Sequence, residues 1–357
     1  MEVTGHLKDL GWNLFFESHF EPFNQAGLTP ARVVEELKGF YRVRSAQAEY
    51  LAETAGKLLY QAVGREGFPA VGDWVAITAR PEEGRARIEH VLPRRTKLTR
   101  KVAGREMSEQ IVATNLDTVF VVSALNREFN LRRIERYLTI VWDSGARPVV
   151  VLNKADLCPD AAARGAEVEG IALGTPVLLL SALEKTGLEA VRAYLAAGTT
   201  AAFVGSSGVG KSTIINRLAD TALRVKPVRA YDDRGQHTTT SRQMIFLSGE
   251  GILIDTPGMR ELQLLEHEEG AAQAFEDIGI LSQGCKFRDC GHRGEPGCAI
   301  EAAVRQAELP VERLESYRKL LAELQFQERK MNPEVARQVK EKWKKIHKAM
   351  RNRAKGC

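Results

Sequence analysis

The sequence contains no long hydrophobic run. None of its segments approaches the roughly 18 consecutive apolar residues of a membrane-spanning helix. The N-terminal residues MEVTGHLKDLGWN also lack the basic and then apolar segments of a secretory leader. We therefore predict a cytoplasmic protein with no membrane partner.

Cysteine is scarce as well. The chain of 357 residues has five cysteines, and three of them, Cys285, Cys290 and Cys298, fall within 14 residues. In a chain without an export signal, such a cluster favours metal binding over disulfides. The remaining composition, with 44% hydrophobic and 27% charged residues, is that of a globular protein of two or three domains.

Positive charge is concentrated at the C-terminus. Residues 328–357 carry a formal charge of +8, whereas the whole chain carries +5, so the remainder sums to −3. A basic tail on a near-neutral body favours a polyanionic partner. The alternative is a solvated helix with surplus lysines.

Short strand patterns fill residues 31–92. ARVVEEL, GFYRVRS, AEYLAETAG, VGDWVAIT and RARIEHVL alternate apolar with polar residues and are separated by glycines. They predict a small antiparallel barrel, with an OB-fold as the leading candidate, in a domain of residues 31–110. We interpret residues 1–30 as a helical or irregular extension, and the basic stretch PRRTKLTRKVAGRE as a linker or loop.

From residue 111 to 265 the pattern changes to continuous apolar strands alternating with helices. The strand patterns TVFVVSA, RPVVVLN, TPVLLLS, AAFVG and GILIDT predict a parallel α/β sheet that is covered on both faces. Residues 266–357 combine helical patterns with the cysteine cluster and the basic tail.

The segment FVGSSGVGKST matches the phosphate-loop pattern G-x-x-x-x-G-K-[ST] between a strand and a helix. Its backbone N–H groups are expected to surround phosphate oxygens at a helix N-terminus. The Lys211 ammonium would neutralise the β- and γ-phosphates, and the Ser212 hydroxyl would bind Mg²⁺. The candidate residues are Gly205, Ser206, Ser207, Gly208, Val209, Gly210, Lys211, Ser212 and Thr213.

Two further loops are candidates for reading the base. In Asn153-Lys154-Ala155-Asp156, the aspartate can accept two hydrogen bonds from guanine, a donor pair that adenine lacks. Alone, this tetrapeptide is equally typical of a helix entry capped by Asp156. Ser181 and Ala182 follow the next strand, where a backbone N–H can meet the guanine carbonyl.

Asp255-Thr256-Pro257-Gly258 ends another apolar strand. Its aspartate can hold Mg²⁺ through water, and the Gly258 N–H can reach a γ-phosphate. The preceding polar segment RGQHTTT is typical of a switch loop, from which a threonine, Thr239 in our assignment, completes the magnesium shell.

These elements stand in an unusual order, because the base-reading loops precede the phosphate loop. Circular permutation explains the reversal, since each strand keeps its neighbours while only a surface connection changes. The motifs NKAD, SAL, GSSGVGKS, GQHTTT and DTPG, with the cysteine cluster and the barrel, resemble the circularly permuted GTPases that act in late assembly of the bacterial small ribosomal subunit. That resemblance covers about residues 31–320. It implies GTP hydrolysis stimulated by the small subunit.

Met259 stands where many GTPases have a water-orienting glutamine, and a thioether cannot do that work. Slow intrinsic turnover is therefore expected. His237 is the candidate replacement, and the resemblance points to the same residue, with Thr238 and Thr239 beside it. The alternative is that His237 only packs in the loop. The family loop reads G-R-H-T-T, but here Gln236 replaces the arginine.

Cys285, Cys290, His292 and Cys298 offer three thiolates and one imidazole, a closed tetrahedral set typical of structural Zn²⁺. Reduced cysteines beside a buried histidine are the alternative, and a catalytic zinc is disfavoured because no position remains for water. With the barrel and the basic tail, this module favours rRNA as partner over a membrane-surface helix. We expect a monomer. The rival functions are an ATP-using P-loop transferase and an RNA-binding module whose nucleotide is structural.

Overall fold

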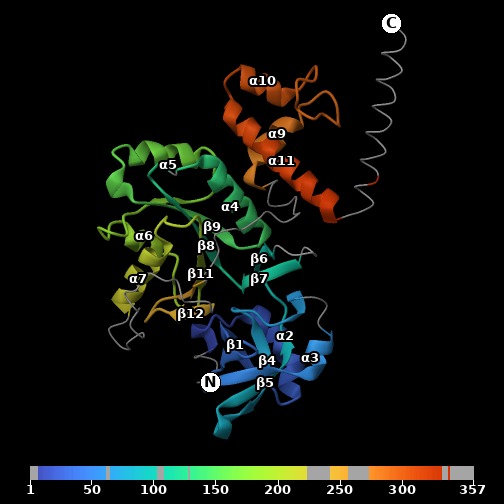
Figure 1. The fold of residues 1–357 in the computed structure, drawn as a ribbon, viewed down its shortest axis with the longest axis vertical. Helices are drawn as coiled ribbons and strands as arrows, with labels where there is room; N and C mark the ends of the chain where they lie inside the picture. Colours follow the sequence, from blue (N-terminus) through green and yellow to red (C-terminus); the bar gives the residue numbers. More distant parts are fainter. Residues whose placement is uncertain are drawn as a thin grey trace. The chain divides into compact units, whose positions relative to one another are not determined.

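The computed structural model describes residues 7–61, 65–102, 108–127, 129–222, 242–255, 273–331 and 337. The chain divides into two compact units, Met1–Gln263 and Leu264–Cys357 (Figure 1). Within the described ranges, no helix is both long enough and apolar enough to cross a membrane.

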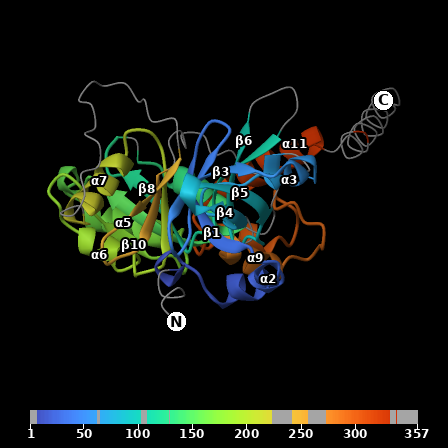
Figure 2. The same cartoon turned by 90° about the horizontal axis from the view of Figure 1, so that it is seen from below.

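The predicted N-terminal barrel is confirmed, except that one of its strand pairs is parallel rather than antiparallel (Figures 1 and 2). Its strands hydrogen-bond in the order β1-β2-β3-β5-β4, and β1 also pairs with β4, which closes the barrel. This five-stranded closure, with helix α3 (Gly56–Gln61) between β3 and β4, is an OB-type barrel. The strands are β1 (Thr29–Glu36), β2 (Tyr41–Arg44), β3 (Glu49–Thr54), β4 (Trp74–Arg80) and β5 (Arg85–Val91).

The N-terminal extension packs against the barrel. Asn13 caps helix α2 (Leu14–Gln25) by accepting a hydrogen bond from the Phe15 N–H. The helix buries one apolar face, and the Trp12 ring meets the Trp74 ring edge-on with centroids 4.7 Å apart. Residues 7–25 therefore belong to the core of the first unit.

The basic stretch after the barrel is not simply a linker. β6 (Lys97–Val102) and β7 (Ser108–Thr114) form a separate two-stranded antiparallel sheet. The sequence pattern did not predict this hairpin, because β6 is rich in charged residues. Its alternation places Leu98 in the core, fully buried, together with Ile111 from the partner strand.

The α/β domain contains a parallel sheet with β11 at its centre. Its strand order is β10-β9-β8-β11-β13-β12, parallel except for β12, and β8, β9 and β11 are almost wholly buried. Strand β12 was not predicted. The strands are β8 (Thr118–Ala124), β9 (Arg147–Asn153), β10 (Val177–Leu179), β11 (Thr200–Val204), β12 (Gln243–Phe246) and β13 (Ile252–Asp255).

Helices connect these strands. α6 and α7 share one apolar cluster with the sheet, whereas α4 contacts β8 and β9, and α5 contacts β10. Continuous burial of the strands follows from this cover on both faces. The helices are α4 (Leu131–Asp143), α5 (Ala161–Glu169), α6 (Leu188–Arg192) and α7 (Lys211–Ala222), with the 3₁₀ turn η3 (Ala155–Leu157) after β9.

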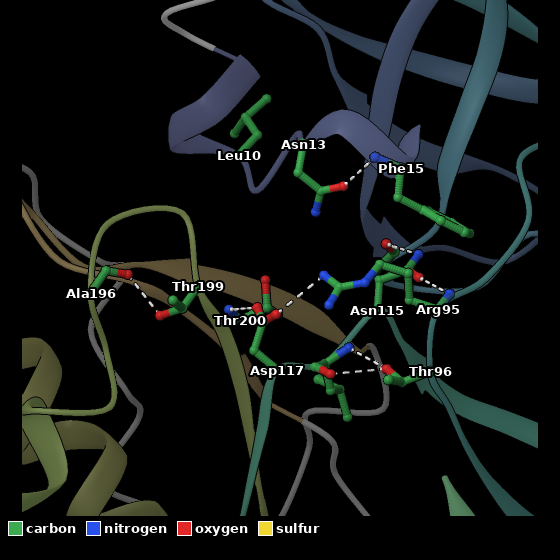
Figure 3. Close-up of polar contacts among 12 residues, drawn as sticks. Leu10, Asn13, Phe15, Arg95, Thr96, Asn115, Asp117, Ala196, Thr199 and Thr200 are labelled. Atoms are coloured by element: carbon green, nitrogen blue, oxygen red, sulfur yellow. Dashed lines mark hydrogen bonds and ion pairs between the residues drawn. The ribbon is translucent and has the colours of Figure 1, made fainter. Parts of the chain in front are cut away.

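The barrel is joined to the α/β sheet through several contacts. β1 pairs with β12 at Glu35 and Gln243, so one sheet of 11 strands runs through both domains. At the start of β8, Asp117 accepts a hydrogen bond of 2.8 Å from the Thr200 N–H and lies 3.5 Å from the Arg95 guanidinium (Figure 3). Backbone hydrogen bonds and side-chain contacts therefore join the barrel to the α/β sheet within the first unit.

A buried arginine completes this junction. Arg32 is 1% exposed and donates to the backbone carbonyls of Leu10, Gly72 and Asn115. These carbonyls belong to the extension, the barrel and the start of the α/β domain. Burial lowers the pKa of the Arg32 guanidinium to about 10, although nearby carboxylates oppose the shift.

The second unit is helical, with α9 (Glu276–Ser282), α10 (Ala299–Arg305) and α11 (Val311–Met331). A bidentate ion pair joins Arg313 of α11 to Asp277 of α9, with N–O distances of 3.0 and 2.9 Å. Arg313 also stacks over the Phe275 ring at 4.3 Å. Apart from residue 337, the basic tail beyond residue 331 lies outside the described residues.

Candidate nucleotide-binding and metal-binding sites

The phosphate-loop motif lies between β11 and α7, as its sequence predicts. Glycines are required there by the backbone. Gly205 has φ +143°, and a Cβ on it would lie 2.2 Å from the Val122 carbonyl oxygen. Gly210 has φ +100°, and its Cβ would meet Asn153 Nδ2 at 2.2 Å. Any side chain at either position would displace a neighbour, so the close approach of strands to this loop depends on glycine.

Lys211 is the first residue of helix α7, and its side chain lies against the phosphate loop. Its ammonium donates to the carbonyls of Gly205 at 2.7 Å and Ser206 at 2.6 Å. Ser212 and Thr213, in the same first turn, are exposed. The positive charge and the N–H groups of a helix start thus meet at one place, which is the arrangement that binds phosphate.

The Asn153 side chain joins the NKAD and SAL loops to the phosphate loop. The side chain is 2% exposed, and its amide donates to the Val209 carbonyl at 2.8 Å. Its oxygen accepts from the Ala182 N–H at 3.0 Å. One buried amide therefore joins loops that follow β9, β10 and β11, although 56 residues separate Asn153 from Val209.

The remaining base-loop residues lie around this amide. Lys154 adopts a left-handed conformation, with φ 63°, and its ammonium donates to the Gly208 carbonyl at 2.9 Å. Asp156, in η3, is exposed to solvent. The Ser181 hydroxyl is buried and accepts from the Glu184 N–H at 3.2 Å. The structure thus brings together the NKAD and SAL loops that the sequence placed at one sheet edge.

Asp255 ends β13, the neighbour of β11. Burial raises the pKa of its carboxyl group, and the Lys211 ammonium opposes that rise. A partly buried carboxylate beside a cation is suited to a divalent metal, which would replace the lost solvation. His237, Thr238, Thr239 and Gly258 lie outside the described residues.

Two arginines near the loops were not predicted as site residues from the sequence. Arg133, in the first turn of α4, donates to the Ser206 hydroxyl at 3.1 Å, and Arg217 of α7 donates to the Ala182 carbonyl at 3.3 Å. Neither belongs to a motif. A usable signal for Arg133 was its place at the start of the helix after β8, because that helix begins at the same sheet edge as the phosphate loop.

The cysteine cluster forms a compact ligand set in the second unit. One ligand atom from each of Cys285, Cys290, His292 and Cys298 lies within 4.8 Å of the others. His292 Nδ1 is 3.7 Å from the Cys285 sulfur and 3.6 Å from the Cys298 sulfur. A tetrahedral ion with ordinary zinc–sulfur and zinc–nitrogen bonds gives a separation of about 3.6 Å, so the donors fit such an ion.

Surrounding groups orient these ligands. Burial raises the pKa of the Cys285 thiol, but hydrogen bonds from the Ala299 and Ile300 N–H groups and from the Cys290 and Cys298 side chains together outweigh burial and lower it. Arg318 of α11 donates to the His292 carbonyl and to the Glu301 carboxylate. The helix start at Cys298 and the α11 arginine thus fix the cluster.

A phosphate loop bonded to an Asn-Lys-x-Asp loop, at the carboxyl edge of a parallel sheet, defines a P-loop GTPase. The base loops precede the phosphate loop in the chain, so this GTPase is circularly permuted. The chain belongs to the RsgA GTPase family, whose model matches residues 91–265. It is therefore a GTP hydrolase.

Several relatives are similar over nearly their whole length. The small ribosomal subunit biogenesis GTPase RsgA of Opitutus terrae is 45% identical over 97% of each chain. The protein of the same name from Syntrophotalea carbinolica is 44% identical over 95% of each chain. The crystal structure of YjeQ from Thermotoga maritima has a TM-score of 0.63 at 28% identity, over 83% of this chain and 98% of its own. That of YloQ, a circularly permuted GTPase, has a TM-score of 0.61 and supports the fold alone.

Proposed function

We propose that this GTPase binds the small ribosomal subunit and acts in late stages of its assembly, and that the subunit stimulates GTP hydrolysis. The names of the relatives support the biological role. For the nucleotide site, the supporting observation is the Asn153 amide, which couples the base-reading loops to the phosphate loop in one rigid assembly.

The nucleotide is held from two sides in this proposal. Asp156 accepts hydrogen bonds from guanine, while Asn153 and Lys154 fix the shape of its loop, and a backbone N–H of the Ser181–Ala182 turn meets the base carbonyl. Residues Gly205 to Thr213 surround the phosphates. Lys211 exchanges its carbonyl partners for phosphate oxygens, and Gly258 donates to the γ-phosphate.

Mg²⁺ is held by Ser212, Thr239 and Asp255 in this assignment. When bound, the ion neutralises charge on the β- and γ-phosphates. The raised pKa of the Asp255 carboxyl group supports this role, because an ion at that position would restore the solvation that burial removes.

Hydrolysis needs a group that orients water, and Met259 supplies none. We assign that role to His237, with Thr238 and Thr239 holding the switch segment around the γ-phosphate. An imidazole can accept a proton from water while its other nitrogen is hydrogen-bonded. Slow turnover without the partner follows if the partner fixes this segment.

The cysteine–histidine cluster is assigned to one structural Zn²⁺, because all four donors are used and no position remains for substrate. With the barrel and the tail of charge +8, this module would contact rRNA. A cytoplasmic monomer fits an asymmetric particle as partner.

The test is GTP turnover by the purified protein, alone and with small ribosomal subunits, with ATP as the competing nucleotide. We expect strong stimulation confined to GTP. The variant His237→Ala should lose the stimulated rate and keep its GDP affinity. Turnover of ATP would favour a P-loop transferase, and unstimulated turnover with tight GTP binding would contradict the ribosomal role while keeping the nucleotide site.

A further inference from the structure

The phosphate loop is contacted from the side by helix α4. Arg133 lies in the first turn of this helix, and its NH1 group donates to the Ser206 hydroxyl at 3.1 Å. One turn further along, the buried Tyr137 lies near the same residue: burial raises the pKa of its hydroxyl, and the Ser206 side chain opposes that rise. Two α4 side chains thus meet on one loop residue.

The pairing of strands in the sheet places the start of α4 beside the phosphate loop. β8, which leads into α4, pairs in parallel with β11, which leads into the phosphate loop, and Val121 stands opposite Val204. Both loops therefore leave the same sheet edge side by side. Asn130 caps α4 by accepting from the Arg133 N–H at 3.1 Å, which fixes the helix start and with it the base of the arginine side chain.

Two positively charged side chains contact Ser206. Lys211 donates to the Ser206 carbonyl while Arg133 donates to the Ser206 hydroxyl, so two cations meet on a single residue. Within the described part of the chain, the exposed Arg133 guanidinium has no carboxylate partner. A neutral hydroxyl offers the guanidinium one hydrogen bond, whereas a phosphate offers an opposite charge and the geometry for two parallel hydrogen bonds.

We propose that Arg133 is a catalytic arginine supplied in cis. It rests on the Ser206 hydroxyl without a γ-phosphate and donates to the γ-phosphate oxygens when GTP is bound. Ser206 belongs to the phosphate loop itself, so the proposed exchange is between a hydroxyl of this loop and the phosphate that the same loop surrounds. This inference rests on the phosphate-loop assignment proposed above.

Arg133 transfers no proton in this step. Water attacks the γ-phosphorus, and the bond from that phosphorus to the bridging oxygen breaks with its electron pair, leaving GDP. The proton that the water loses passes to the His237 imidazole in the mechanism proposed above and then to the released inorganic phosphate. The guanidinium stabilises the negative charge that spreads over the equatorial and leaving oxygens, the role an arginine finger plays in other P-loop GTPases.

A purely structural role makes a different prediction. If Arg133 only fastens Ser206, removing the guanidinium would loosen the loop for GDP and GTP alike, and Ser206→Ala would reproduce the effect. If Arg133 contacts the γ-phosphate, GDP affinity is spared and the loss falls on GTP hydrolysis.

The experiment compares full-length Arg133→Gln, Arg133→Lys and Ser206→Ala with the wild type. Arg136→Gln is the matched control, because it removes the same charge from an exposed position of α4 one turn further from the loop. The readouts are single-turnover GTP hydrolysis, the GDP dissociation constant, and the gain in GDP affinity on adding aluminium fluoride, a mimic of the transferred phosphoryl group.

We expect Arg133→Gln to slow hydrolysis at least about 100-fold, the low side of known arginine-finger effects, and to abolish the aluminium fluoride gain. GDP affinity should change less than twofold, and Arg133→Lys should recover a small part of the rate. Hydrolysis within threefold of wild type, or equal losses of GDP and GTP affinity matched by Ser206→Ala, would overturn the proposal. Wild-type protein that binds neither nucleotide would instead refute the phosphate-loop assignment.

Discussion

Replacing Asn153 by alanine tests whether the base and phosphate loops form one assembly. The change removes the donor to the Val209 carbonyl and the acceptor of the Ala182 N–H, and both groups lie in buried surroundings. Each unmade bond at a buried group costs about 1–3 kcal/mol, so the two together should cost the variant about 2–6 kcal/mol. If the loss falls on the nucleotide-binding conformation, GDP affinity drops by about 30- to 10⁴-fold.

The assays are titration with a fluorescent GDP analogue and urea denaturation without nucleotide. Asn13→Ala is the matched control, since it removes one capping amide far from the loops. It should cost about 1 kcal/mol of stability and leave GDP affinity unchanged. If Asn153→Ala bound GDP within twofold of wild type and unfolded at the same urea concentration, the reasoning from these two bonds would be refuted.

Two further results are expected. Because the pKa of the Asp255 carboxyl group is raised, its charged form costs folding stability once the pH exceeds the ordinary aspartate range. Asp255→Asn should therefore unfold at a higher temperature than wild type without nucleotide. The variant should, however, lose the stabilisation of roughly 2.7 kcal/mol that Mg·GDP at 100 times its dissociation constant gives to the wild type. If Mg·GDP raised the unfolding temperature equally in both proteins, the assignment of Asp255 to the metal site would be contradicted. Metal analysis should find one zinc per chain. Cys298→Ser should lose this zinc and expose residues 273–331 to proteolysis, while its GDP affinity stays unchanged. A second unit that stays fully folded without metal would exclude a structural role for the zinc.

The parts of the fold that the sequence predicted are those specified by local patterns. The barrel strands alternate in polarity, the α/β strands are continuously apolar, and the phosphate loop carries glycines at positions where only glycine fits. The reversed order of motifs was also sufficient to infer permutation. Each individual motif or strand pattern lies within about a dozen consecutive residues, and the order of the motifs can be read along the chain, so no tertiary information was needed.

The features that the sequence did not predict depend on distant partners. Strand β12 has only four residues, and its position depends on pairing with β13 and with β1. The contact with β1 is distant in sequence, since Arg242 and Glu36, which form an ion pair there, are 206 residues apart. Strand β6 lies within the basic stretch whose sequence is typical of a linker or loop, because pairing with β7, rather than polarity, makes it part of a sheet. Arg133 carried no motif, since its contact with Ser206 arises from two parallel strands being neighbours.

The central claim is that loops from separate parts of the chain build one guanine-specific site, and the direct test is nucleotide selectivity of wild type and Asp156→Asn. The wild type should bind GDP at least about 10³-fold more tightly than ADP or XDP, because only guanine presents two donors to the carboxylate. Asp156→Asn should lose this preference and favour XDP, whose carbonyl oxygen can accept from the new amide. If Asp156→Asn kept the wild-type preference for GDP, Asp156 would not read the base, and the assembled site would be wrong.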